Sequence, residues 1–77
     1  MKRKYGADEY TSSFIEDRAQ GFGGYELLRV ENGKEHRVAT VIFWDGMGQY
    51  FVETFGDVPL AILEALIAET RAAIGEK

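Results

Sequence analysis

The chain has no cysteine, and it has only one histidine, His36, and one proline, Pro59, among its 77 residues. Without cysteine there can be no disulfide and no thiolate chemistry. With one histidine, a zinc ion would have to be bound almost entirely by carboxylates, which zinc sites seldom use alone. A domain of this size has a small core and usually gains support from disulfides, a metal or oligomerisation. We therefore expect no metal or other cofactor, and either an efficient core or self-association.

Long apolar runs are also missing. The most apolar stretch covers residues 58–68 and carries Glu64, whereas a membrane-spanning helix needs roughly 20 apolar residues. Lys2, Arg3 and Lys4 are followed by the polar stretch 5–9, where a signal peptide would need an apolar segment. The sequence therefore predicts a cytoplasmic protein that does not enter a membrane.

Basic residues are scarce in the second half of the chain, which has a formal net charge of −4. No Lys, Arg or His occurs between Val38 and Thr70, although five acidic residues do: Asp45, Glu53, Asp57, Glu64 and Glu69. Binding to a phosphate backbone needs cations along the contact face. This pattern argues against nucleic acid as a partner, and it suggests an acidic regulator of a basic protein as an alternative function.

The middle of the chain is predicted to form a β-meander. Residues rich in β-formers are separated by Asn32-Gly33, a strong hairpin signal, and by the turn 45–48. A periodic helix follows, with Asp57 as its expected N-cap and Gly75 as its C-cap. We expect a single α+β domain over residues 8–77 after a flexible basic tail over residues 1–7. Its expected elements are three antiparallel strands and one C-terminal helix: 25–31, 34–44, 49–55 and 58–74.

Residues Asp8–Gln20 can be read in two ways. Tyr10, Phe14, Ile15 and Ala19 have helical spacing, whereas Tyr10–Ile15 could instead form an edge strand. The run Gly21-Phe22-Gly23-Gly24 is expected to end this segment as a turn or connector.

Each reading has an element order that resembles a known fold. With a helix over Asp8–Gln20, the order αβββα resembles the double-stranded-RNA-binding domain. With a strand, the order ββββα resembles the single-stranded-DNA-binding coactivator fold. Either resemblance concerns element order alone and implies nucleic-acid binding, but no binding residue carries over from it. A separate hypothesis places nucleic-acid binding on seven basic residues that could cluster near the first hairpin: Lys2, Arg3, Lys4, Arg18, Arg29, Lys34 and Arg37. The RNA-binding family opens its last helix with a basic cluster, whereas residues 57–64 here contain no cation.

The Asn32-Gly33 turn sets an expected register that pairs Leu28 with Arg37 and Leu27 with Val38. One sheet face then carries Leu28, Val30, Ala39, Val41, Phe43, Tyr50 and Val52, and the other carries Tyr25, Leu27, Val38, Ile42, Trp44, Phe51 and Phe55. Both faces are apolar, but one helix can cover only one of them. We expect the N-terminal segment or a second subunit to cover the other face.

The C-terminal helix has two stripes of its own. One stripe, expected to pack on the sheet, consists of Leu63, Leu66, Ile67, Thr70 and Ile74. The opposite stripe consists of Ala61, Ala65, Ala68 and Ala72, beside the acidic Glu64. Small side chains would let a second helix approach closely, although alanine is also the best helix former and often occupies exposed positions.

No motif in the chain supports catalysis. Ser12 and Ser13 lie far in sequence from His36, the only candidate base, and the glycine-rich run precedes a strand instead of opening a helix as phosphate-binding loops do. The sequence therefore predicts a non-enzymatic interaction module, a homodimer or a binder of another protein. The candidate contact residues are Ala61, Ala65, Ala68 and Ala72 on the helix, Trp44 and Phe51 on the sheet, and the acidic Glu53 and Glu64.

Overall fold

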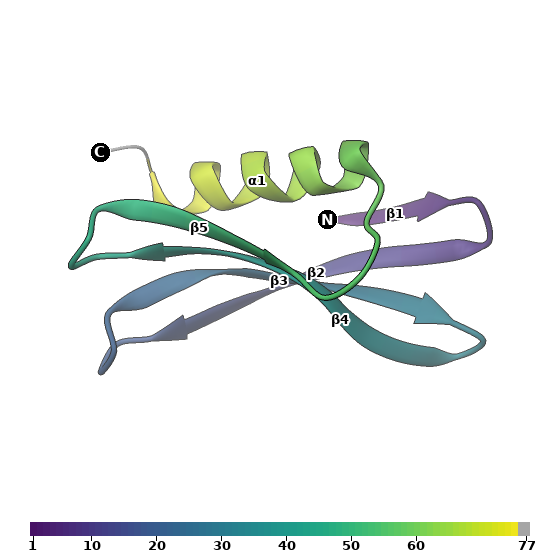
Figure 1. Cartoon of the computed structure of the whole chain (residues 1–77), viewed down its shortest axis with the longest axis horizontal. Coiled ribbons are helices and arrows are strands. Elements are labelled where there is room, and N and C mark those ends of the chain that lie inside the picture. The colour runs from purple at the N-terminus through teal and green to yellow at the C-terminus, as the bar shows by residue number, and fades with distance from the viewer. Residues whose placement is uncertain (76–77) are drawn as a thin grey trace.

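The computed structural model describes residues 1–75 and shows one antiparallel sheet with a helix on one side (Figure 1). The sheet is a meander, because its spatial order β1-β2-β3-β4-β5 is also the chain order. The elements are β1 (Lys2–Tyr5), β2 (Asp8–Asp17), β3 (Phe22–Glu31), β4 (Lys34–Trp44), β5 (Gln49–Thr54) and α1 (Leu60–Ile74). The α+β class and the meander are confirmed.

The sheet has five strands instead of three or four. The helical reading of Asp8–Gln20 is wrong, because Asp8–Asp17 form β2, which pairs with β3 from Glu9 to Asp17. The order αβββα is wrong for the same reason. Residues 2–5, expected to lie in a tail, form β1 on the outer side of β2.

The hairpin between β3 and β4 is confirmed. Asn32 and Gly33 have φ values of 50° and 76°, as a type I′ turn requires, and Glu31 pairs with Lys34. The glycine run upstream differs from expectation, since only Gly21 lies in a turn. Gly23 and Gly24 are inside β3, and a Cβ on Gly24 would lie 2.1 Å from the Val41 carbonyl oxygen. Gly24 therefore permits a close approach of two strands.

A β-bulge in β4 changes which residues share a face. Leu28 pairs with Arg37 as expected, but Leu27 pairs with Ala39, so Val38 is an additional residue in the ladder. Beyond the bulge the expected register is wrong by one residue, which exchanges the two faces of β3. Leu27 and Tyr25 therefore share a face with Ala39 and Val41, while Leu28 and Val30 lie on the opposite face.

The helix α1 packs on β3 and β4 and buries one face of the sheet. We call this the helix-side face; its core residues Leu27, Ala39 and Val41 cluster with Ile62 and Leu66 of the helix. Leu66 and Thr70 are buried as the helical stripe predicted, and Ile62 joins them. The helix begins at Leu60 with Pro59 at the N-cap position and no side-chain cap, so the N-cap expected at Asp57 is wrong.

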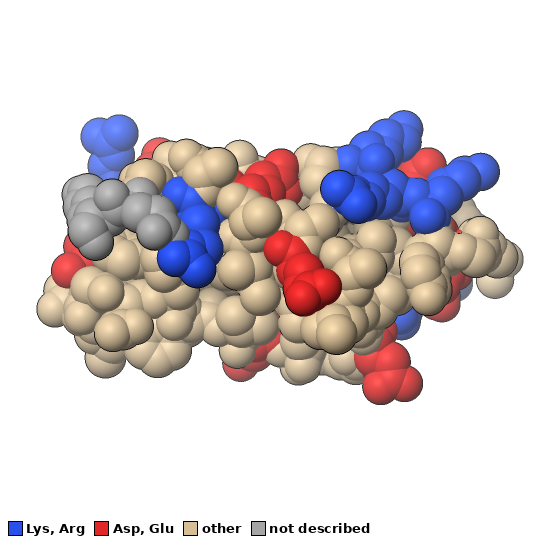
Figure 2. All heavy atoms as spheres, turned by 90° about the horizontal axis from the view of Figure 1, so that it is seen from above, with Lys and Arg blue, Asp and Glu red and all other residues tan. Residues whose placement is uncertain are grey.

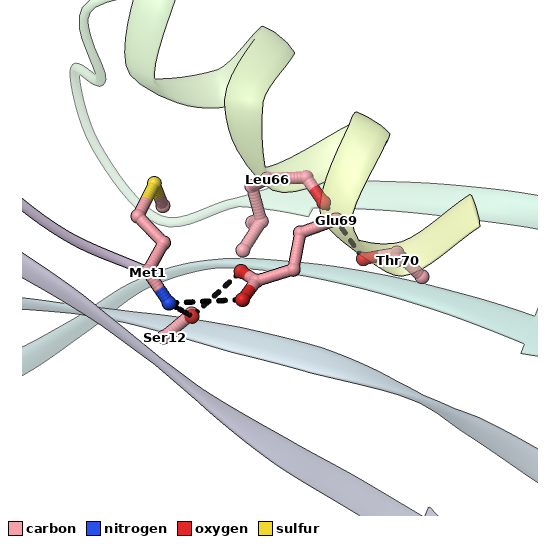
Figure 3. A network of polar contacts seen from close by, with 5 residues as sticks. All are labelled: Met1, Ser12, Leu66, Glu69 and Thr70. Carbon is pink, nitrogen blue, oxygen red and sulfur yellow. Dashed lines mark hydrogen bonds and ion pairs between the residues drawn. The ribbon is translucent and has the colours of Figure 1, made fainter. Parts of the chain in front are cut away.

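A polar contact fastens the helix to the start of the chain (Figure 3). The Met1 ammonium donates to the Ser12 hydroxyl at 2.7 Å and to Glu69 Oε2 at 2.9 Å, and the Ser12 hydroxyl donates to Glu69 Oε1 at 2.6 Å. Burial raises the pKa of Glu69, but the hydrogen bonds from Met1 and Ser12 and the charge of the ammonium outweigh it. The net effect lowers the pKa of Glu69, and the carboxylate stays ionised in this contact.

Candidate interaction surface

The second face of the sheet has no covering layer among residues 1–75 (Figure 1). We call it the open face; it carries Leu28 and Val30 at one end of the strands and Phe22, Ile42 and Trp44 at the other. The N-terminal segment, expected as one of two covers for this face, extends the sheet sideways as β1 and β2. No helix or strand among residues 1–75 therefore packs over the apolar side chains of the open face.

Two half-exposed aromatic side chains lie along β5 and just beyond it. Phe51 is 45% exposed and Phe55 is 49% exposed. The Arg37 guanidinium lies 5.4 Å from the centre of the Phe55 ring. The same side chain faces Glu26 at 3.7 Å, so a cation–π contact and an ion pair converge where β3, β4 and the end of β5 meet.

Trp44 belongs to a smaller aromatic contact at the other end of β4. Its ring lies 4.8 Å from that of Phe22, centre to centre, with a tilt of 54°. A shallow pocket of about 350 Å³ opens between Trp44 and the β5 edge, and it is lined by Thr40, Ile42, Trp44, Phe51, Val52 and Glu53. Apolar walls next to one carboxylate suit a protein surface or a side chain of another chain.

The structure brings together only some of the residues that the sequence selected. Trp44, Phe51 and Glu53 line one pocket. The alanine stripe lies on α1, on the other side of the sheet, with Ala61, Ala68 and Ala72 exposed and Ala65 half-buried, beside an exposed Glu64. These two sets cannot form one contact surface on a single protomer.

The acidic residues from Asp45 to Glu69 do not form one surface either. Asp45 lies in the turn before β5, Glu53 on the open face and Glu64 on the helix, while Glu69 is held by Met1 and Ser12. The basic side chains gather mainly over the β1 end of the sheet (Figure 2). Two others, Arg29 and Arg37, lie within 4.0 Å of glutamates. The residues that line the pocket beside Trp44 include no Lys or Arg.

Sequence reasoning missed the free edge of β5. Val52 lines the pocket, is 48% exposed and lies on the edge strand next to Phe51. A signal was available, because the last strand of a meander is an edge strand and the residues of β5 include no Lys, Arg or Pro.

No protein-family model, curated protein or solved structure matches the chain. In residues 1–75, no three His, Asp or Glu side chains are grouped as metal ligands, and no helix is long and apolar enough to cross a membrane. The open face and its β5 edge are therefore the features of the molecule that bear on function.

Proposed function

We propose that the protein is a non-enzymatic interaction module that self-associates as a homodimer through the β5 side of its sheet. The observation that carries this proposal is the open face, where Phe51 and Phe55 remain half exposed on a sheet with one covered side. Antiparallel sheets tolerate one solvated face when that face is polar. Here the face carries charged side chains at the β1 end, but Phe22, Ile42, Trp44 and Phe51 lie together towards the β5 side, and a group of apolar side chains on a solvated face is typical of contact surfaces.

The size of the face is adequate for a dimer. The longest dimension of the protein is 38 Å, and the strands run along this direction (Figure 1). Five strands spaced about 4.8 Å apart give a sheet face of about 700 Å², close to the ~800 Å² that each partner contributes to a standard interface. A contact that uses the β5 half of this area would be smaller and would dissociate at micromolar concentrations more readily than an obligate dimer.

The alanine stripe is the competing surface, and a matched pair of substitutions separates the two. Phe51→Glu places a charge on the open face, and Ala68→Glu places the same charge on the exposed side of α1. Both positions are exposed, so neither change should prevent folding. We expect Phe51→Glu to weaken self-association by about 2 kcal/mol, roughly 30-fold, because an unpaired carboxylate would have to be desolvated.

The measurement is molar mass by light scattering across a tenfold dilution series of each variant, with circular dichroism as a check of folding. The proposal expects a dimer for the unaltered chain and for Ala68→Glu, and a monomer for Phe51→Glu. A dimer that survives Phe51→Glu but dissociates with Ala68→Glu would move the interface to the helix. A folded monomer for the unaltered chain at every concentration would refute homodimerisation.

A further inference from the structure

The two edges of the sheet differ in how well they are protected against another strand. β1 is four residues long, and three of these are the exposed cations Lys2, Arg3 and Lys4. Short edge strands that carry Lys disfavour pairing with another chain. β5 has six residues, Gln49–Thr54, and its one charged residue is Glu53. Of the two edges, β5 is the one that can accept a strand.

The direction of the free backbone groups on β5 follows from one hydrogen bond. The Phe55 amide donates to the Val38 carbonyl oxygen at 2.9 Å, so the Phe55 backbone points into β4. Alternate residues of a strand point the same way, hence Phe51 and Glu53 also bond to β4. The backbone groups of Tyr50, Val52 and Thr54 therefore point away from the sheet.

We propose that β5 pairs antiparallel with β5 of a second copy about a two-fold axis at Val52, which joins two sheets into one of ten strands. This inference rests on the proposed homodimer and specifies its geometry. Val52 would lie opposite Val52 of the other copy, and Tyr50 opposite Thr54. All three outward residues on each strand would be paired, giving about six hydrogen bonds between the copies.

The side chains of β5 favour a two-fold axis at Val52 over an axis at either adjacent residue. With the axis at Val52, Glu53 of each copy lies opposite Phe51 of the other. An axis at Glu53 would place two carboxylates directly opposite each other, which is destabilising. An axis at Phe51 would leave Thr54 without a strand partner, since its counterpart would be Gly48 in the turn.

The helix leaves room for the second copy. α1 packs mainly on β3 and β4. Its Arg71 guanidinium lies 5.9 Å from the centre of the Tyr50 ring, but the Val52 side chain on the same face of β5 is still 48% exposed. Pairing would bring Val52, Tyr50 and Thr54 of both copies together on this side. On the open face it would bring Phe51 of each copy within reach of the other across a diagonal. The exposed apolar side chains of β5 would thus gain neighbours on both faces.

The pairing closes on itself, because a two-fold axis uses the same edge of both copies. The outer edges of the ten-stranded sheet would then be two β1 strands, each protected by its cations. Growth into a fibre is therefore blocked. A partner strand from a different protein could use the same edge, and the test must separate that case from a second copy.

Single cysteines provide the test, since the chain has no cysteine of its own. In the proposed register, Val52→Cys places two Cα atoms about 5.5 Å apart, within the range of a disulfide. Thr54→Cys is the matched control on the same strand and face, where the two positions would be about 14 Å apart and could not be bridged. Each variant is oxidised at the concentration where light scattering shows a dimer, and covalent dimers are measured on a non-reducing gel.

The expected result is a covalent dimer for Val52→Cys in at least tenfold excess over Thr54→Cys. If the unaltered chain is a dimer but Val52→Cys gives no excess, the register is refuted while homodimerisation stands. A dimer formed by stacking of the two open faces would give this second result, a dimer without an excess of covalent product, because both cysteines would lie on the outer, helix-side faces. If the unaltered chain is a monomer, the homodimer and its register are both refuted, and β5 remains an edge at which a strand of another protein could pair.

A second variant keeps the test independent of oxidation. Val52→Pro removes an amide that points outward and is not used by β4, so the sheet can form as before. We expect an unchanged circular dichroism spectrum and at least a tenfold increase in the dissociation constant. A dimer of unchanged affinity would contradict pairing at β5.

Discussion

Adjacent glycines in β3 should respond in opposite directions to the same substitution. A Cβ added at Gly24 would lie 2.1 Å from the Val41 oxygen and 2.7 Å from the Ile42 Cα atom, both of them backbone atoms. A Cβ added at Gly23 would meet only side-chain atoms, the nearest being Ile74 Cδ1 at 3.6 Å, which is an ordinary contact. Gly24→Ala should therefore destabilise the protein and Gly23→Ala should not.

The expected size of the effect follows from these distances. To relieve the contact at Gly24, β3 and β4 must separate by about 1 Å, which would weaken the ladder at the centre of the sheet. We expect a loss of about 3 kcal/mol or more in the free energy of unfolding. Gly23→Ala reduces the freedom of the unfolded chain and should be neutral or stabilising by up to about 1 kcal/mol.

Urea denaturation followed by Trp44 fluorescence measures both variants. The protein concentration must be equal in all samples, because association would add to apparent stability. A loss of about 3 kcal/mol is a large part of the total stability of a domain of this size, roughly 4–12 kcal/mol, so Gly24→Ala is best measured at low temperature. Equal midpoints for Gly23→Ala and Gly24→Ala would refute the close approach of β3 and β4.

Two further substitutions test local contacts. Glu69→Gln should lower the free energy of unfolding by about 1–2 kcal/mol at neutral pH, because it removes the carboxylate that accepts from Met1 and Ser12. The pKa of Glu69 is lowered by folding, so the stabilisation is present at pH values above the ordinary glutamate pKa of 4.5 and is lost as the pH falls below that value. Urea titrations at several pH values should show the free energies of unfolding of the two proteins converging in acid. A difference that stays constant with pH would contradict the prediction. Asn32→Ala should cost about 1 kcal/mol, because alanine tolerates the φ of 50° less well than asparagine. Thermal unfolding checks this, with Lys34→Ala, just outside the turn, as a control that should change little.

The strands from Tyr25 onward could be predicted because their signals are local. Asn32-Gly33 fixes a two-residue turn, and β4 is dense in β-branched and aromatic residues. The start of β2 could not be assigned, because Tyr10 and Phe14 have helical spacing while the residues between them are polar on both faces of the strand. Pairing with β3 decided the conformation, and that pairing is a tertiary contact that a local pattern does not reveal.

The candidate surface was predicted in part. Phe51, Trp44 and Ile42 were placed on one face correctly, since the four-residue turn before β5 preserves the alternation. The bulge at Val38 could not be predicted, because nothing in the sequence marks the extra residue, and it exchanged Leu27 with Leu28 between faces. The edge position of β5 follows from the meander and becomes evident only when the strands are placed in order.

The meander order has a consequence for how the chain reaches its fold. Every strand pairs with the strand next to it in sequence, so each step of sheet formation closes a short loop and loses little chain entropy. Such topologies have low contact order for a β-rich protein and fold quickly. A slow, concentration-dependent phase in refolding would therefore report the meeting of two chains, separate from the formation of either sheet.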